Sequence, residues 1–146
     1  MKITRVTFIP HRLRRKTPWQ TASYSADAVQ ALYVKIDTDD GIAGIGATSV
    51  MPKDNATFEP GIRALESAAG QRLMGRELLS IDVLMDQLQE GVAGFPRHKV
   101  AVEIALYDLL GKIQNVSVAA LLGGARRELI PVLKMLGMGP AELMAE

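Results

Sequence analysis

The first third of the chain alternates between apolar and polar residues in the way that β-strands do. Residues 3–9 are rich in β-branched side chains. Residues 28–37 place Leu32, Val34 and Ile36 on one face and polar residues on the other. Asp40-Gly41 follows, a dipeptide typical of two-residue hairpin turns, and residues 42–50 return as a third strand. The pattern predicts three consecutive strands.

Two glycines stand in the third predicted strand, at Gly44 and Gly46. A glycine inside a strand has no side chain to pack, so it indicates that another part of the molecule approaches the backbone closely. We therefore expect some other part of the structure to lie close against the backbone of this strand.

Apolar residues then recur at helical spacing in three segments. Residues 62–73 form one apolar face that ends at Gly75. Ser80 is suited to cap a second helix that closes at Gly91, and a third runs from about Pro96 to Ile113. Strands followed by helices predict an α+β fold, a three-stranded antiparallel sheet followed by a helical bundle.

The pattern changes after Gly124. Residues 130–136 read as another strand, and Pro140 begins what looks like one helical turn. Since one βα unit cannot bury its own apolar face, we expect a domain boundary at this point. Residues 1–124 would be one domain, and residues 125–146 a linker and the start of a second domain whose remainder is absent from this chain.

The stretch AVEIALYDLLGK, followed by a short linker and LLGG, resembles the N-terminal capping domain of the enolase superfamily, of the mandelate racemase and muconate lactonizing enzyme type. The hairpin DDGIAGIG also fits. The sequence departs from the family pattern at Ala47, where Glu is usual, and at Ser117, where Pro is usual. The residues that carry the resemblance are Ala101, Glu103, Ala105, Leu106, Tyr107, Asp108, Gly111, Lys112 and Leu121 to Gly124.

The resemblance implies that the chemistry belongs to a (β/α)-barrel domain after this one, whose first strand would be the segment near residue 130. In such enzymes Mg²⁺, bound by the barrel and not by this chain, stabilises the enediolate formed when a proton leaves the carbon next to a carboxylate. The implied reaction is a racemisation, an epimerisation or a cycloisomerisation. A sugar-acid dehydration by the same superfamily and a non-catalytic α+β binding or dimerisation module are the alternatives.

The resemblance also implies which segments shape the substrate pocket. They are a predicted loop over residues 11–27, with Trp19, Thr21 and Tyr24 as contacts, and a loop over residues 47–57, with Val50 and Met51. The alternative for the first is a solvated surface loop, and for the second ordinary packing against the first. We predict no catalytic residue and no metal ligand in this chain.

Composition narrows the possible binding partners and the possible location of the protein. The formal net charge is +1, which does not favour nucleic-acid binding, and the chain has no cysteine. The resemblance implies a homo-oligomer that acts on a small-molecule carboxylate, and we expect it to be cytoplasmic, with no nucleic-acid or membrane partner. The helical carboxylates Asp82, Glu103 and Asp108 lack metal-site spacing and are interpreted as structural. Residues 97–99, Arg-His-Lys, are interpreted as a solvated helix start.

Overall fold

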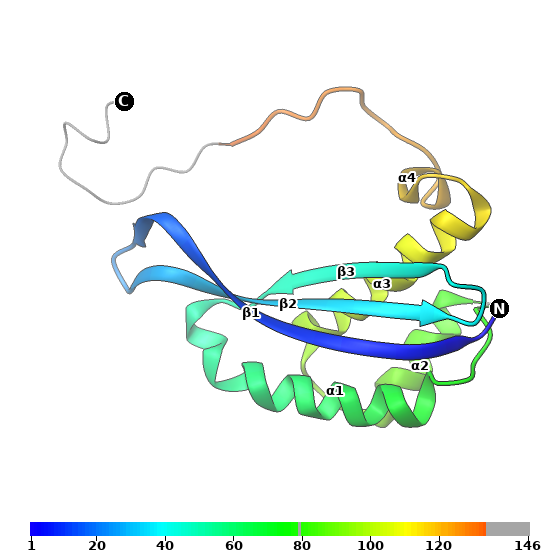
Figure 1. The fold of residues 1–146 in the computed structure, drawn as a ribbon. Helices are drawn as coiled ribbons and strands as arrows, with labels where there is room; N and C mark the ends of the chain where they lie inside the picture. The colour runs from blue at the N-terminus through cyan, green and yellow to red at the C-terminus, as the bar shows by residue number, and fades with distance from the viewer. Residues whose placement is uncertain (79, 134–146) are drawn as a thin grey trace.

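The computed structural model describes residues 1–78 and 80–133, in which an antiparallel sheet lies against a layer of helices (Figure 1). The strand order is β1-β2-β3. The predicted α+β class is confirmed. In chain order the elements are β1 (Ile3–Gln20), β2 (Ser25–Thr38), β3 (Ala43–Ser49), the 3₁₀ helix η1 (Pro52–Thr57), α1 (Phe58–Arg72), α2 (Ile81–Gly91), α3 (Pro96–Gln114) and α4 (Val118–Leu121).

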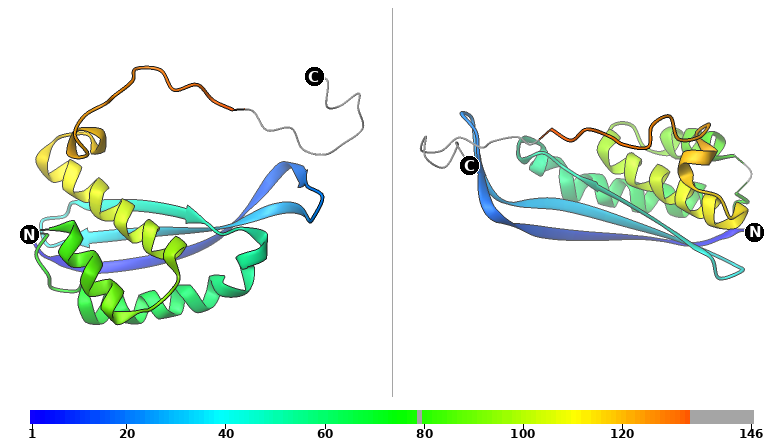
Figure 2. Two further views of the ribbon diagram at one scale, coloured as in Figure 1. Left: turned by 180° about the vertical axis from the view of Figure 1, so that it is seen from behind. Right: turned by 90° about the horizontal axis from the view of Figure 1, so that it is seen from above.

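The helices cover one face of the sheet, as the two further views in Figure 2 show. The alternating residues of β2 point into this layer, and Leu32, Val34 and Ile36 are fully buried. Across the three strands Phe8, Val34 and Gly46 stand opposite one another. The hydrophobic alternation of residues 28–37 therefore identified the buried face correctly.

The two glycines of β3 are the places where α3 meets the sheet. A Cβ atom added at Gly46 would lie 2.0 Å from the carbonyl oxygen of Ala101, and one at Gly44 would lie 2.1 Å from that of Ala105. Both distances are impossible for real atoms, so the backbones of β3 and α3 are in direct contact. The expected close approach is confirmed, and the partner is a helix.

The predicted helix ends are confirmed. Gly75 has a φ of 74° just after α1, a conformation that glycine adopts without strain. The Ser80 hydroxyl accepts a hydrogen bond from the backbone N–H of Val83 at the start of α2. Helix α1 begins at Phe58, earlier than the first residue of its predicted apolar face.

The prediction of a loop over residues 11–27 is wrong. Strands β1 and β2 continue through most of this segment, pair as far as Gln20 with Ser25, and leave a turn of four residues. This hairpin extends beyond the helices (Figures 1 and 2). Because neither face of the extension is fully covered, its side chains do not need to alternate in polarity, and the strand signal is missing from the sequence.

Residues 130–133 form no strand, although a strand was predicted over 130–136. The apolar side chains of this segment are almost fully exposed, from 79% for Ile130 to 92% for Val132. The rest of that predicted strand and the predicted helical turn from Pro140 lie outside the described residues.

Candidate functional site

The tip of the β1–β2 hairpin is built around Thr21. Its hydroxyl oxygen lies 3.2 Å from the backbone nitrogen of Tyr24 and 3.3 Å from that of Ser23, and accepts from both. The Thr21 backbone N–H donates to the Tyr24 carbonyl at 2.9 Å. Threonine is suited to this turn because its hydroxyl oxygen accepts hydrogen bonds from backbone N–H groups that have no backbone carbonyl to pair with in the turn. Thr21 therefore fixes the position of Tyr24.

The segment after β3 approaches the hairpin tip. Its backbone is anchored by the Val50 N–H, which donates to the carbonyl of Gln30 on β2 at 3.1 Å. Met51 is 39% exposed. Tyr24 and Met51, with Ser23 and Pro52, line a cavity of about 460 Å³. Two side chains predicted to contact substrate, from segments far apart in the sequence, thus share one cavity.

The other three predicted contacts lie elsewhere. Val50 is 3% exposed and lines a different cavity of about 330 Å³, together with Phe95 and His98. Trp19 is half-buried on the hairpin, where the Arg15 guanidinium lies 6.0 Å from the centre of its ring. Trp19 and Thr21 do not line the Tyr24–Met51 cavity. The sequence pattern did not single out Ser23 or Pro52.

The start of α3 holds the segment between β3 and α1 in place. The Nε2 atom of His98 is 3.0 Å from the Phe58 carbonyl, to which its N–H donates, and the Arg97 Nε is 3.6 Å from a carboxylate oxygen of Asp54. The His98 ring also packs against Phe58 and Phe95. This anchoring fixes the residues that follow Met51.

The interpretation of residues 97–99 as a solvated helix start is wrong for two of them. His98 is 2% exposed and Lys99 is 7% exposed. Burial lowers the pKa of His98, and the hydrogen bond to the Phe58 carbonyl opposes that shift only in part. Burial also lowers the pKa of Lys99, whose Nζ donates to the Gln89 side chain. Helical periodicity did not reveal this, because both residues are polar and sit in the first turn.

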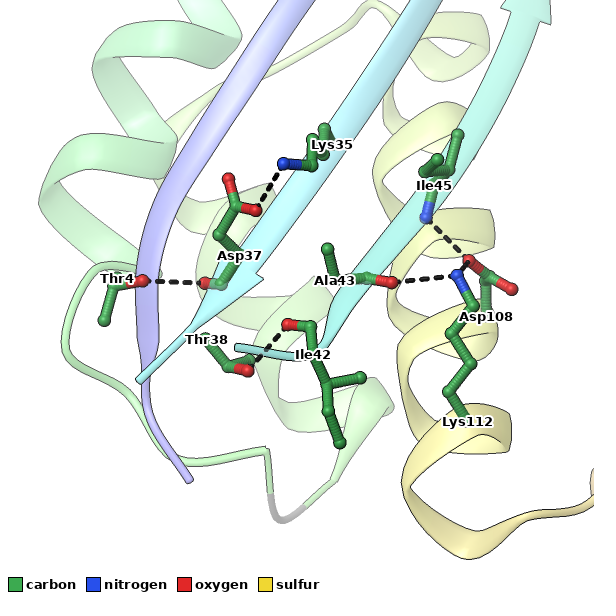
Figure 3. Close-up of polar contacts among 9 residues, drawn as sticks. All are labelled: Thr4, Lys35, Asp37, Thr38, Ile42, Ala43, Ile45, Asp108 and Lys112. Atoms are coloured by element: carbon green, nitrogen blue, oxygen red, sulfur yellow. Dashed lines mark hydrogen bonds and ion pairs between the residues drawn. The ribbon is translucent and has the colours of Figure 1, made fainter. Parts of the chain in front are cut away.

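Asp108 and Lys112 of α3 form hydrogen bonds with the edge strand β3 (Figure 3). An oxygen of the Asp108 carboxylate accepts from the Ile45 N–H at 2.8 Å and from Lys112 Nζ at 2.7 Å. Lys112 Nζ also donates to the Ala43 carbonyl at 2.8 Å. These side chains bind backbone groups on the open edge of β3, where another strand could otherwise pair. The interpretation of Asp108 as a structural residue agrees with these contacts. Besides their ion pair within α3, Asp108 and Lys112 connect this helix to the backbone of β3.

Within residues 1–78 and 80–133, no three His, Asp or Glu side chains come together as a metal site would require. The described residues therefore do not fit a bound Mg²⁺. In the same described part of the chain, no helix is both long and apolar enough to cross a lipid bilayer.

Comparison with known proteins identifies the family. The chain matches the N-terminal domain of the mandelate racemase and muconate lactonizing enzyme family over residues 3–123, and it belongs to that family. It is 31% identical, over its full length, to the N-succinyl-L-Arg/Lys racemase of Bacillus cereus. The crystal structure of that racemase superposes on 99% of this chain with a TM-score of 0.89 and 30% identity.

Two more relatives show the range of the family. A dipeptide epimerase from Methylococcus capsulatus, solved with Mg and the dipeptide L-Arg-D-Lys, is 28% identical, covers 97% of this chain and has a TM-score of 0.87. The L-rhamnonate dehydratase of Saccharopolyspora erythraea is 30% identical over 73% of this chain and 27% of its own length. The chain spans 40% of the length of the Bacillus cereus racemase and of the Methylococcus capsulatus structure.

Proposed function

We propose that this chain is the capping domain of a Mg²⁺-dependent enzyme that removes the proton next to a substrate carboxylate, as a racemase, an epimerase or a cycloisomerase. The observation that carries the proposal is the cavity between Tyr24 and Met51, where the hairpin tip and the segment after β3 meet. Family membership supports it, because the relatives include racemases and epimerases. A cap needs a concave surface of this kind to cover a substrate.

The proposal divides the work between two parts of the protein. Residues 1–124 form the cap, and residues 125–146 are the linker and the start of a (β/α)-barrel. The metal ligands and the groups that move the proton belong to the barrel, since the described residues of this chain hold no cluster that fits Mg²⁺. When bound, Mg²⁺ supplies stabilisation of the enediolate. The cap orients the substrate and excludes water.

Within the cap, the five residues suggested by the sequence have different roles. Tyr24 and Met51, which line the same cavity, contact the substrate directly. Thr21 positions Tyr24 through the turn, and Val50 positions Met51 through its backbone hydrogen bond to β2. Trp19, half-buried beside Arg15 on the same hairpin, lies outside this cavity and would contact a part of the substrate that extends beyond it.

Exchange of the substrate α-proton in deuterated water tests this function. The full-length enzyme with Mg²⁺ is expected to exchange the α-proton of N-succinyl amino acids or dipeptides, as seen by proton NMR. Tyr24→Ala is expected to lower kcat/KM about tenfold, because positioning contacts contribute to the barrier. Arg63→Gln, on the exposed surface of α1, is the matched control. Unchanged kinetics in Tyr24→Ala would show that the cavity is not the substrate site.

The second candidate is a sugar-acid dehydratase, because the similarity to L-rhamnonate dehydratase reaches 30% identity. The same enediolate expels a β-hydroxyl when the substrate has one. The two candidates differ in product: formation of a 2-keto acid from an aldonic acid would favour the dehydratase. We also propose that the protein is a homo-oligomer, which sedimentation of the full-length enzyme would test.

A further inference from the structure

His98 is a buried histidine of which only one ring nitrogen has a partner. Its side chain is 2% exposed, and its Nε2–H donates to the Phe58 carbonyl at 3.0 Å. The other ring nitrogen, Nδ1, is buried and has no hydrogen-bond partner among the described residues. A neutral ring leaves one acceptor unused there. A protonated ring would place a charged N–H donor at the same buried position, where no described protein atom accepts it.

The His98 ring lies in a slot formed by Phe58, Gly61 and Phe95. A Cβ atom added at Gly61 of α1 would lie 2.6 Å from the His98 Nε2 atom, so the ring lies directly on the helix backbone. Phe58 and Phe95 pack against the ring. Phe95 has a φ of 51°, a conformation that a bulky residue keeps only where its surroundings hold it. The neutral ring is therefore part of what holds the start of α3 in a strained form.

Two polar links join the start of α3 to the segment that carries Met51. One is the hydrogen bond from His98 to the Phe58 carbonyl. In the other, the Arg97 Nε lies 3.6 Å from the Asp54 carboxylate, and the Asp54 backbone N–H donates to the Met51 carbonyl at 2.8 Å. Asp54, Arg97 and His98 also line the cavity of about 330 Å³, which leaves this segment room to move. The position of Met51 therefore depends on these two links.

No charged group is placed to stabilise a protonated His98. The charged residues nearest to the slot along η1, α1 and α3 whose side chains the structure describes are Asp54, Glu59, Arg63, Arg97 and Lys99. In the part of the chain that the structure describes, none of them forms an ion pair or a hydrogen bond with His98. Asp54 and Arg97 pair with each other, and Lys99 donates to the Gln89 side chain.

We propose that His98 is a positioning residue for the Met51 side of the substrate site, and that it holds this side in place only while its ring is neutral. The inference rests on the proposed function and adds a dependence of the same site on pH. A released, solvated ring titrates at its ordinary pKa of about 6.5, whereas burial lowers the pKa of the ring in the slot. The hold is therefore complete above pH ~6.5, and the released form gains up to about tenfold for each pH unit below it.

Hydrogen–deuterium exchange tests the release without any substrate. In the full-length enzyme, residues 51–58 are expected to open up to about tenfold more often at pH 5.5 than at pH 7.5, after correction for the intrinsic effect of pH on exchange. Residues 42–49 of β3 are the internal reference and should not change. His98→Gln supplies an amide donor that does not titrate, so it should remove the pH dependence. His11→Gln, at an exposed hairpin position, should keep it.

A pH-independent profile in the parent enzyme, or the same profile in His98→Gln, would overturn the inference. A second variant decides the matter if His98→Gln does not fold. Arg97→Gln removes the other link, which does not titrate in this range, and should raise the opening of residues 51–58 about two- to fivefold at every pH, the range for an exposed ion pair. If Arg97→Gln abolished the pH dependence, the ion pair and not His98 would carry the effect, and the inference would be wrong.

Steady-state kinetics show whether the release reaches the substrate. With an N-succinyl amino acid or dipeptide that the full-length enzyme accepts, the KM of the parent should rise up to about tenfold more than that of His98→Gln between pH 7.5 and 5.5. The kcat values should follow the same pH profile in both. Equal KM profiles would show that His98 stabilises the cap without positioning the substrate site, and would overturn the inference. Absence of turnover with every substrate would count against the proposed function alone, because the exchange measurement decides whether His98 holds the Met51 segment.

Discussion

Strands β1 and β2 each belong to two regions with opposite properties. The half of the sheet that α1 and α3 cover contains the fully buried Leu32, Val34 and Ile36 and backbones packed without intervening side chains. The half beyond the helices carries exposed cations and a turn held by Thr21. The same pair of strands thus provides a rigid base and a protruding tip. The comparison suggests that stability and recognition reside in separate parts of one hairpin.

The largest expected effect is in the covered half. Gly46→Ala should destabilise the chain by about 3 kcal/mol, because the new methyl group would overlap the Ala101 carbonyl, which the helix backbone cannot easily move. Gly70→Ala is the control: nothing lies within 4 Å of its added Cβ, and the helix should gain about 0.5–1 kcal/mol. Urea unfolding followed by circular dichroism measures both. Equal stability of the two variants would refute the direct contact of β3 with α3.

A pair of leucines compares the two regions directly. Leu106 on α3 is completely buried, whereas Leu13 on the hairpin is 41% exposed. Leu106→Ala should cost about 3 kcal/mol through lost burial and the cavity that remains. Leu13→Ala should change stability by less than ~0.5 kcal/mol. The free energies of unfolding of the two variants check this, and a costly Leu13→Ala would place the hairpin in the core.

Much of the covered half could be predicted from the sequence. Burial imposes alternation on β2 and helical spacing on α1 to α3, and Gly44 and Gly46 predicted a close approach to the backbone of β3, although not that α3 makes it. The uncovered half imposes no such pattern, so strands were mistaken for a loop. His98 shows the same limit inside the core: its burial depends on Phe58, which is 40 residues away in the sequence.

The candidate site was predicted only in outline. The family resemblance indicated the two segments, but only the fold shows that Tyr24 shares a cavity with Met51 while Val50 faces a different one. The role of Thr21 is set by hydrogen bonds within a turn that the sequence did not locate. Which residues meet across a site depends on the register between strands, and a single sequence does not specify that register outside the core.

A smaller effect is expected where α3 caps the edge of the sheet. Asp108→Ala removes the acceptor of the Ile45 N–H and one of the two acceptors of the Lys112 ammonium, and should cost about 1–1.5 kcal/mol. Glu103→Ala is the control on the same helix; Asp108→Ala gains more helix propensity than this control does, so the measured difference is a lower bound on the cost of the lost hydrogen bonds. The difference in unfolding free energy between the two variants is the measurement. If the unfolding free energies of the two variants differ by less than ~0.3 kcal/mol, water accepts the hydrogen bond of the Ile45 N–H as well as Asp108 does.

The pH dependence of stability should distinguish the two histidines. A histidine whose pKa is lowered by folding is neutral in the folded state while the unfolded chain takes up a proton, so stability is full above pH ~6.5 and falls as the pH decreases below it. His98→Gln should flatten this decline between pH 7.5 and 5.5, with a slope change of at most one proton. His11→Gln, at an exposed hairpin position, should keep it. Thermal midpoints across this range test the difference, and identical profiles would contradict it.

The smallest change is expected from removing the hairpin tip itself. Replacing residues 14–28 by Asn-Gly joins Leu13 to Val29, which already face each other across the ladder, so the remaining register is kept. The variant loses the exposed Arg12–Asp27 pair and no residue of the hydrophobic core. Its unfolding free energy should therefore stay within about 1 kcal/mol of the parent chain. In a second variant, residues 14–28 are replaced by an equal number of Gly and Ser residues. This variant loses the same side-chain contacts but keeps the length of the connection between β1 and β2. If the short turn abolishes cooperative unfolding while the Gly/Ser variant keeps it, the new turn is strained. If both variants unfold without cooperativity, the hairpin is part of the core, and the separation of stability from recognition is wrong.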